Sequence, residues 1–157
     1  MEKENILRYM GGIVCESSAV DQQTQSLSAF KIIDQINVNI KSTDPTVTSK
    51  SLQKITIPLS LQVISLWKRN KQSDQGRDIE GKIVVEIIDP RGEVLAKHPI
   101  NVLLPLNKIR SRTILNIQGM PVSTTGEYCV QMKEVNTNGK ESSPLAKLCF
   151  DLILNKE

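Results

Sequence analysis

Six basic residues in two groups are the side chains of this sequence best suited to binding a charged ligand. They are Lys68, Arg69, Lys71, Lys108, Arg110 and Arg112. Arg110 and Arg112 are two positions apart, so on a β-strand both would point to one face and could contact a phosphate or an acidic partner. Surfaces that bind nucleic acid usually add stacking aromatic rings to such charge, and we expect the aromatic rings of this chain to be buried instead. A solvated strand face is the simpler interpretation.

The single histidine and the acidic residues form no recognisable catalytic or metal-binding pattern. His98 lies next to Pro99 in the middle of a strand-like segment, without a cysteine or a pair of carboxylates nearby. A zinc site needs three or four ligands and a catalytic imidazole needs an orienting partner, so we expect a partly buried structural histidine. Asp34 shares the parity of the apolar residues around it, which indicates a buried acid or a bulge that resets the register. We predict no catalytic residue, no metal site and no cofactor.

The three cysteines are too few and too widely spaced to suggest a disulfide framework. Cys15, Cys129 and Cys149 are an odd number and form no Cys-x-x-Cys motif. A reactive thiol needs a neighbouring cation, a helix N-terminus or a second thiol to lower its pKa. We therefore expect reduced structural thiols, as in a cytoplasmic protein.

The elements that carry these residues are predicted to be β-strands. Apolar and polar residues alternate with a period of two through most of the chain, and no long amphipathic helical pattern occurs. The predicted strands are residues 7–16, 30–40, 55–67, 81–89, 94–104, 110–118, 126–135 and 146–154. Longer polar segments at 17–26, 41–50 and 68–80 read as loops. About eight short strands without helices predict an all-β fold, an antiparallel immunoglobulin-like β-sandwich.

Several local signals sharpen this prediction. Pro58 cannot donate to a ladder, so its strand should have an edge or a bulge there. Asp89-Pro90-Arg91-Gly92 suits a type I turn between two strands, and residues 136–139 suit another turn. The Gly-x-Tyr sequence at Tyr128 resembles a tyrosine corner, in which the hydroxyl binds a neighbouring loop. Cys129 follows Tyr128 directly, so alternation turns it away from the core, and we expect no disulfide between the sheets.

All five aromatic residues share the parity of their apolar neighbours. They are Tyr9, Phe30, Trp67, Tyr128 and Phe150. We therefore expect all five in the core, which leaves no exposed aromatic platform for sugars, bases or methylammonium groups. This expectation argues against the ligand classes that are recognised by stacking.

Composition fits one soluble globular domain spanning residues 1–157. The net charge is +3, from 20 basic and 17 acidic residues that are interleaved along the chain, which argues against a dedicated polyanion binder. The first residues lack the apolar run of a signal peptide, and no apolar run is long enough to span a membrane. We expect a cytoplasmic protein.

Three stretches carry a resemblance to a known family: residues 9–21 with 27–34, residues 87–95, and residues 126–128. In these segments the chain resembles a family of uncharacterised bacterial proteins built as small β-sandwiches, a domain of unknown function. The resemblance implies a sandwich fold and a bacterial or phage setting. It implies no catalytic residues.

Three functional hypotheses follow from these observations. The first is a non-enzymatic module that works through protein contact, by its sheet faces or by the loops at residues 41–50 and 68–80. Its partner would be another protein or a second copy of itself, and no membrane is involved. It rests on the absence of catalytic motifs and on apolar residues expected on outer strand faces: Ile33, Ile64, Leu66, Ile88, Leu103 and Ile153. The second is an anion-binding or nucleic-acid-binding module that uses the basic strand face around Arg110 and Arg112. The third is an unrecognised hydrolase that uses scattered acids.

Overall fold

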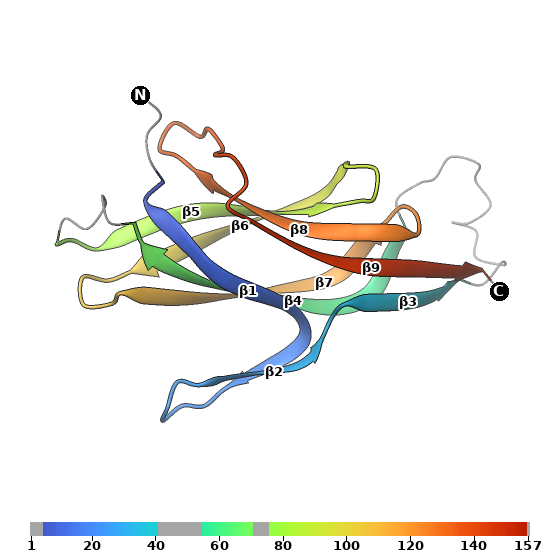
Figure 1. Cartoon of the computed structure of the whole chain (residues 1–157), viewed down its shortest axis with the longest axis horizontal. Coiled ribbons are helices and arrows are strands. Elements are labelled where there is room, and N and C mark those ends of the chain that lie inside the picture. The colour runs from blue at the N-terminus through green and yellow to red at the C-terminus, as the bar shows by residue number, and fades with distance from the viewer. Residues whose placement is uncertain (1–4, 41–54, 71–75, 157) are drawn as a thin grey trace.

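The computed structural model describes residues 5–40, 55–70 and 76–156, and these form two β-sheets packed face to face (Figure 1). The described residues contain nine strands and no helix. The strands are β1 (Leu7–Val20), β2 (Leu27–Ile32), β3 (Gln35–Ile40), β4 (Ile55–Arg69), β5 (Ile79–Ile88), β6 (Val94–Leu104), β7 (Arg110–Val122), β8 (Gly126–Val135) and β9 (Ala146–Lys156). The all-β sandwich predicted from alternation is therefore confirmed.

The two sheets differ in the direction of one strand. The four-stranded sheet has the order β2-β1-β4-β7, and the five-stranded sheet has the order β3-β9-β8-β5-β6. Every neighbouring pair is antiparallel except β3 and β9, which run parallel from Gln35↔Asp151 to Ile40↔Lys156. The sandwich is thus antiparallel except for one parallel pair of strands at the edge of the five-stranded sheet.

The segment predicted as one strand over residues 30–40 is divided between the two sheets. Lys31 has a positive φ of 53°, which an L-residue adopts only at some cost and which turns the chain. Ile33 then donates its backbone N–H to Val14 O (2.8 Å), and Asp34 O accepts from Asp151 N (2.9 Å). The chain crosses here from β2 in one sheet to β3 in the other. The interpretation of Asp34 as a buried acid is wrong, because Asp34 is exposed. The chain changes sheet at this residue, and the pairing of β2 and of β3 shows no bulge there.

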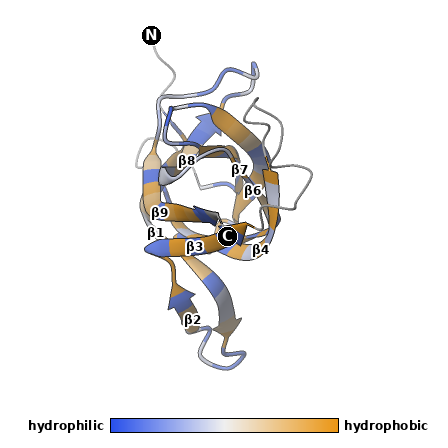
Figure 2. Cartoon of the chain, turned by 90° about the vertical axis from the view of Figure 1, so that its right-hand side faces the viewer, coloured by the Kyte–Doolittle hydropathy of each residue, from blue (hydrophilic) through white to orange (hydrophobic). Residues whose placement is uncertain are grey.

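Beyond Cys15, β1 leaves β4 and forms a hairpin with β2 that projects from the sandwich (Figures 1 and 2). We call residues 16–32 the β1–β2 arm. Phe30 lies on it and is 51% exposed, and Ile32 is 63% exposed. The prediction that all aromatic residues lie in the core is therefore wrong for Phe30. Its parity matches a dry strand face, but the hairpin has no second layer packed against that face.

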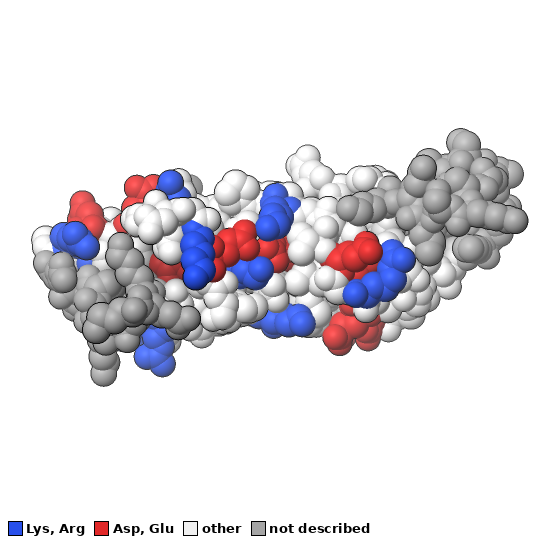
Figure 3. All heavy atoms as spheres, turned by 90° about the horizontal axis from the view of Figure 1, so that it is seen from above, with Lys and Arg blue, Asp and Glu red and all other residues white. Residues whose placement is uncertain are grey.

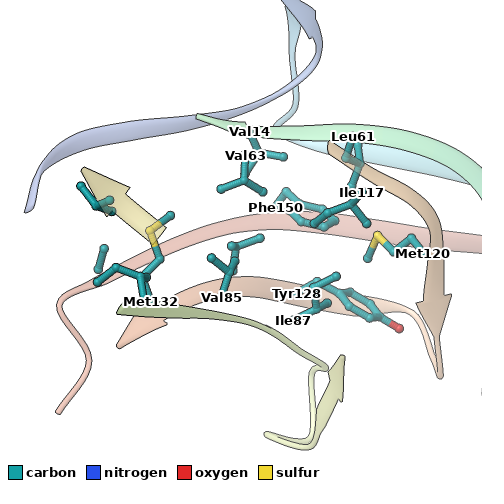
Figure 4. Close-up of a cluster of buried hydrophobic side chains, with 14 of the residues drawn as sticks. Val14, Leu61, Val63, Val85, Ile87, Ile117, Met120, Tyr128, Met132 and Phe150 are labelled. Atoms are coloured by element: carbon teal, nitrogen blue, oxygen red, sulfur yellow. The ribbon is translucent and has the colours of Figure 1, made fainter. Parts of the chain in front are cut away.

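The core fills the space between the sheets with aliphatic, methionine and aromatic side chains from both (Figure 4). Trp67 is fully buried, and its Nε1 donates to Ser65 Oγ (3.0 Å) and Thr113 Oγ1 (3.1 Å). Tyr9 packs edge-on against it at a centroid distance of 5.5 Å. Trp67 is therefore buried without an unsatisfied indole N–H, as a core tryptophan requires.

Tyr128 closes the turn between β7 and β8 as a tyrosine corner. Its hydroxyl donates to Thr124 O (2.6 Å) and accepts the backbone N–H groups of Ser123 (2.9 Å) and Thr124 (3.1 Å). Its ring is fully buried and stacks on Phe150. The structural role predicted for Tyr128 is confirmed.

The Asp89 to Gly92 turn forms as predicted, with Gly92 N donating to Asp89 O (2.9 Å). The Asp89 side chain is buried and accepts hydrogen bonds from Ser123 Oγ (2.7 Å) and from the backbone N–H groups of Glu93 and Arg91. Burial alone would raise the pKa of this carboxyl, but the hydrogen bonds together lower it. The turn is thereby fastened to the loop that Tyr128 also holds.

Two further sequence signals are confirmed. The ladder between β4 and β7 is interrupted between Ile57 and Ser60, which is the bulge expected at Pro58. The turn at residues 136–139 closes with a hydrogen bond from Gly139 N to Asn136 O (2.9 Å). At Pro58 the missing N–H ends regular pairing, whereas at the second turn Gly139 adopts a positive φ of 77° that other residues disfavour.

A buried acid fastens the start of β1 to the five-stranded sheet. Glu134 is 6% exposed, and its Oε1 accepts the backbone N–H of Ile6 (3.1 Å). Its Oε2 has no hydrogen-bond partner among the described residues. Burial raises the pKa of Glu134, and the backbone hydrogen bonds offset only part of that effect.

The apolar residues that the sequence places on outer strand faces are mostly less exposed than expected. Of the six outer-face residues named above, only Leu103 is largely exposed, at 58%. Ile64 is buried at 4%, and the other four are partly buried. Within the described part of the chain, no helix has the length and apolar character needed to cross a bilayer.

Candidate functional site

Three basic side chains lie side by side across the outer face of the four-stranded sheet. Arg8 on β1 is directly opposite Lys68 on β4, and Lys68 is directly opposite Arg110 on β7. We call these three residues the basic row. Neighbouring strands are about 4.8 Å apart, so three positive charges occupy a strip roughly two strand spacings wide. Arg112 lies two positions further along β7 and points to the same face.

Within the described part of the chain, no acidic side chain pairs with the basic row. Among the described residues, none of Arg8, Lys68, Arg110 and Arg112 forms an ion pair. Arg112 Nη2 donates only to the backbone oxygen of Gln25 on the β1–β2 arm, at 3.2 Å. Like charges directly opposite on adjacent strands repel and destabilise the sheet by a few tenths of a kcal/mol up to about 1 kcal/mol. The row is therefore an arrangement that an anionic group would stabilise.

On the opposite face of the molecule, several charged side chains form ion pairs with one another. On the outer face of the five-stranded sheet, Lys97 and Lys133 each contact both Glu86 and Glu141, with N–O distances of 3.1–3.4 Å. Figure 3 looks onto the side where β5 and β8 lie, and basic and acidic side chains alternate across it. Hydrogen bonds to Glu141 and then to Glu86 raise the pKa of Lys97. These four side chains neutralise one another, whereas those of the basic row do not.

Arg69 does not belong to the binding surface that the sequence predicts. It is 8% exposed, and its guanidinium donates to the backbone oxygens of Arg77, Leu104, Pro105 and Lys108. Alternation explains the correction, because Arg69 has the parity of buried Trp67 while Lys68 faces outward. Arg69 is a structural tie between the end of β4 and the β6–β7 turn.

Of the remaining predicted residues, Lys108 is exposed in the turn between β6 and β7. Lys71 lies outside the described residues, as do the predicted loop at residues 41–50 and residues 71–75 of the predicted loop at 68–80. Arg8 was missed by the sequence prediction, because only the register of β1 against β4 reveals that it is the neighbour of Lys68.

Apolar side chains are exposed in the turn that adjoins the basic row. Leu106 is 60% exposed and Ile109 is 67% exposed, and both belong to the turn that leads into Arg110. We call residues 105–109 the apolar turn. Its backbone is held by hydrogen bonds from Leu106 N to Asp78 Oδ1 (2.7 Å) and from Lys108 N to Pro105 O (2.8 Å). Exposed aliphatic side chains on an ordered turn next to unpaired cations are typical of a protein contact surface.

An open pocket of about 390 Å³ lies at the same end of the sandwich. It is lined by Asp78, Ile79, Glu80, Leu103, Leu104 and Pro105. Both of its carboxylates are exposed, and that of Asp78 binds the apolar turn. The pocket brings no nucleophile or histidine to these acids.

His98 occupies the place that the sequence predicts. It is partly buried on β6, directly opposite Val85, and its Nε2 is buried without a hydrogen-bond partner among the described residues. No acid or cysteine of the described chain joins it in a metal-ligating group.

The expectation of three reduced thiols is wrong for two of them. Cys129 on β8 and Cys149 on β9 are directly opposite each other, 4.1 Å apart at Cα, and form a disulfide. Cys15 is free and buried. The sequence prediction considered only a disulfide between sheets, and it missed one between neighbouring strands because strand register is invisible to single-sequence parity. The disulfide removes one of the supports for a cytoplasmic location.

Comparisons with known proteins add little to this description. No family model and no curated protein matches the chain. Among solved structures, it is similar to a β-glucuronidase from glycoside hydrolase family 2, at 18% sequence identity and a TM-score of 0.37. The similarity covers 65% of this chain and 11% of that chain. A likeness this distant carries no inference about activity, and the resemblance to an uncharacterised bacterial family stays a prediction.

Proposed function

We propose that the protein is a non-enzymatic interaction module that binds an acidic, partly apolar segment of a protein partner on the outer face of its four-stranded sheet. The observation that carries this proposal is the basic row, in which three cations lie in register on adjacent strands and form no ion pair with an acid of the described residues. Carboxylates of a partner would remove the mutual repulsion of these cations.

The apolar turn favours a protein over a nucleic acid as the partner. Leu106 and Ile109 could receive aliphatic side chains of a segment whose carboxylates contact the row. Nucleic-acid surfaces instead place aromatic rings beside their cations. The only aromatic ring that is largely exposed among the described residues, Phe30, lies on the β1–β2 arm, and the described residues of β4 and β7 carry no exposed aromatic ring.

The proposal is tested with a variant that lacks the basic row and a control variant that has the same net charge as that variant. The variant Arg8→Ala/Lys68→Ala/Arg110→Ala loses three cations from this face. The control Lys82→Ala/Lys140→Ala/Lys147→Ala loses three exposed lysines elsewhere. Binding of a fluorescent Glu/Leu-rich peptide is measured by anisotropy at about 20 mM and about 200 mM salt. We expect the row variant to bind at least about tenfold more weakly and the control to bind as the native chain does.

Three results separate the candidate functions. A single-stranded oligonucleotide that binds the row more tightly than the peptide, with a steep salt dependence, would favour the nucleic-acid alternative. Concentration-dependent dimerisation that the row variant abolishes would make a second copy of the chain the partner. If neither the peptide nor the oligonucleotide binds at low salt, and the chain stays monomeric, the basic row has no binding function.

A further inference from the structure

A second group of side chains with ligand chemistry lies on the outer face of β8 and β9. Cys129 and Cys149 are directly opposite each other, and Glu127 precedes Cys129 by two residues on the same strand, so it shares their face. One carboxylate oxygen of Glu127 and the two sulfur atoms lie within 4.8 Å of one another. Cys149 and Glu127 are exposed, so solvent and small reagents reach the group.

A further carboxylate lies beside this group. Glu127 is directly opposite Asp151 in the register of β8 and β9, so two carboxylates occupy one cross-strand pair beside the cysteine pair. Both are exposed, and neither forms an ion pair with a described residue. Carboxylates directly opposite each other repel, and a bound cation would offset that repulsion. Two cysteines and two carboxylates thus fill two successive cross-strand pairs on this face.

We propose that reduction of the Cys129–Cys149 disulfide opens a binding site for a thiophilic divalent cation, for which Zn²⁺ is the physiological representative. Both thiolates and Glu127 are its ligands. Asp151 or water completes a tetrahedral set of the kind that zinc prefers. Two sulfur atoms bound to one zinc at about 2.3 Å each are roughly 3.8 Å apart, which side-chain rotation of two facing cysteines allows.

The chemistry balances with a dithiol as the reductant. The dithiol transfers two electrons and two protons to the protein disulfide: the protein S–S bond breaks, two thiols form, and the reductant becomes a disulfide. Zn²⁺ then displaces the two thiol protons, and these leave to the solvent. The disulfide and the metal exclude each other, so the redox poise of the compartment selects between a closed site and an open one.

The test uses the full chain in both redox states. The chain is reduced on an immobilised phosphine, handled without oxygen, and titrated with Zn²⁺ by calorimetry in two buffers of different ionisation heat. We expect one Zn²⁺ per reduced chain, buffer-dependent heat that reports the released protons, and no binding to the oxidised chain. Circular dichroism of the reduced chain checks that the strands remain.

Matched variants assign the ligands. Cys149→Ser and Glu127→Gln are expected to weaken Zn²⁺ binding by at least roughly tenfold, whereas Cys15→Ser, which changes the one cysteine outside the site, leaves it unaltered. Glu127 is exposed, so its variant tests the site without disturbing the core. The proposal is overturned if the folded, reduced chain binds no Zn²⁺, if Glu127→Gln binds as well as the native chain, or if the reduced chain loses its fold.

Discussion

At the scale of single residues, the hydroxyl of Tyr128 has the clearest structural task. It exchanges three hydrogen bonds with the backbone of Ser123 and Thr124. Tyr128→Phe keeps the ring and leaves these buried backbone groups without a partner, so we expect the free energy of unfolding to fall by about 1–3 kcal/mol. Urea denaturation measures it. Tyr9→Phe is the matched control, because its hydroxyl has no hydrogen-bond partner among the described residues. A loss of similar size in both variants would contradict the tyrosine corner.

The burial of Glu134 predicts how the stability of the folded chain changes with pH. Because burial raises its pKa in the folded chain, the folded state binds a proton more readily than the unfolded state does. The cost of ionising Glu134 is absent below the unfolded pKa of about 4.3 and grows as the pH rises through the raised folded value. Relative to the native chain, Glu134→Gln should therefore gain stability between about pH 4 and about pH 7. Urea titrations at both pH values test this, and a constant difference would contradict it.

The alternation of apolar and polar residues predicts the burial of some side chains correctly and of others wrongly. Parity placed Trp67, Tyr128 and Phe150 in the core correctly, because each lies on a strand with a second sheet packed against its inner face. It failed at Phe30, where no layer covers the strand. Arg69 was misassigned to a binding surface, although its parity with Trp67 indicated the inner face. Burial of an arginine depends on four backbone oxygens that converge only in the folded chain.

At the scale of elements, Arg69 and Lys68 are neighbours on β4 with opposite roles. Arg69 ties β4 to the β6–β7 turn through four backbone oxygens. A lysine ammonium cannot reproduce this forked geometry, so Arg69→Lys should lower the free energy of unfolding by about 2–3 kcal/mol. Lys68→Ala should change it by less than about 0.5 kcal/mol. Urea denaturation of both variants decides between the roles, and equal losses would refute the distinction.

The alternation pattern of the sequence does not show which strands pair or in which register. The positions of most strands, the bulge at Pro58 and the turn at Asp89 follow from local residue chemistry. The basic row and the Cys129–Cys149 disulfide follow instead from which residues face each other across strands. Parity assigns a face, but only register assigns a neighbour. For this reason Arg8 and Glu127 were missing from the predicted binding residues.

At the scale of the whole molecule, the disulfide is a crosslink that acts mainly on the unfolded chain. Its cysteines are 20 residues apart in sequence, and closing a loop of that length stabilises the folded state by about 3 kcal/mol in the chain-entropy model. Reduction, or Cys129→Ser/Cys149→Ser, should lower the stability by that amount. Urea denaturation with and without reductant measures the loss. Reductant should leave the double variant unaffected, and an unchanged native chain would mean that the crosslink stabilises nothing.

Because β3 pairs with β9, the sandwich can be completed only late in the synthesis of the chain. Asn39 and Asn155 share a side-chain hydrogen bond although they are 116 residues apart. At 5–20 residues per second, the ribosome needs roughly 6–23 s to make the chain between them. Throughout that interval Ile36, Val38 and Ile40 have no strand to pair with, and the sandwich cannot close. The nascent chain therefore carries an unpaired apolar strand for seconds, so the interval in which this strand can pair with other chains falls during translation rather than after it.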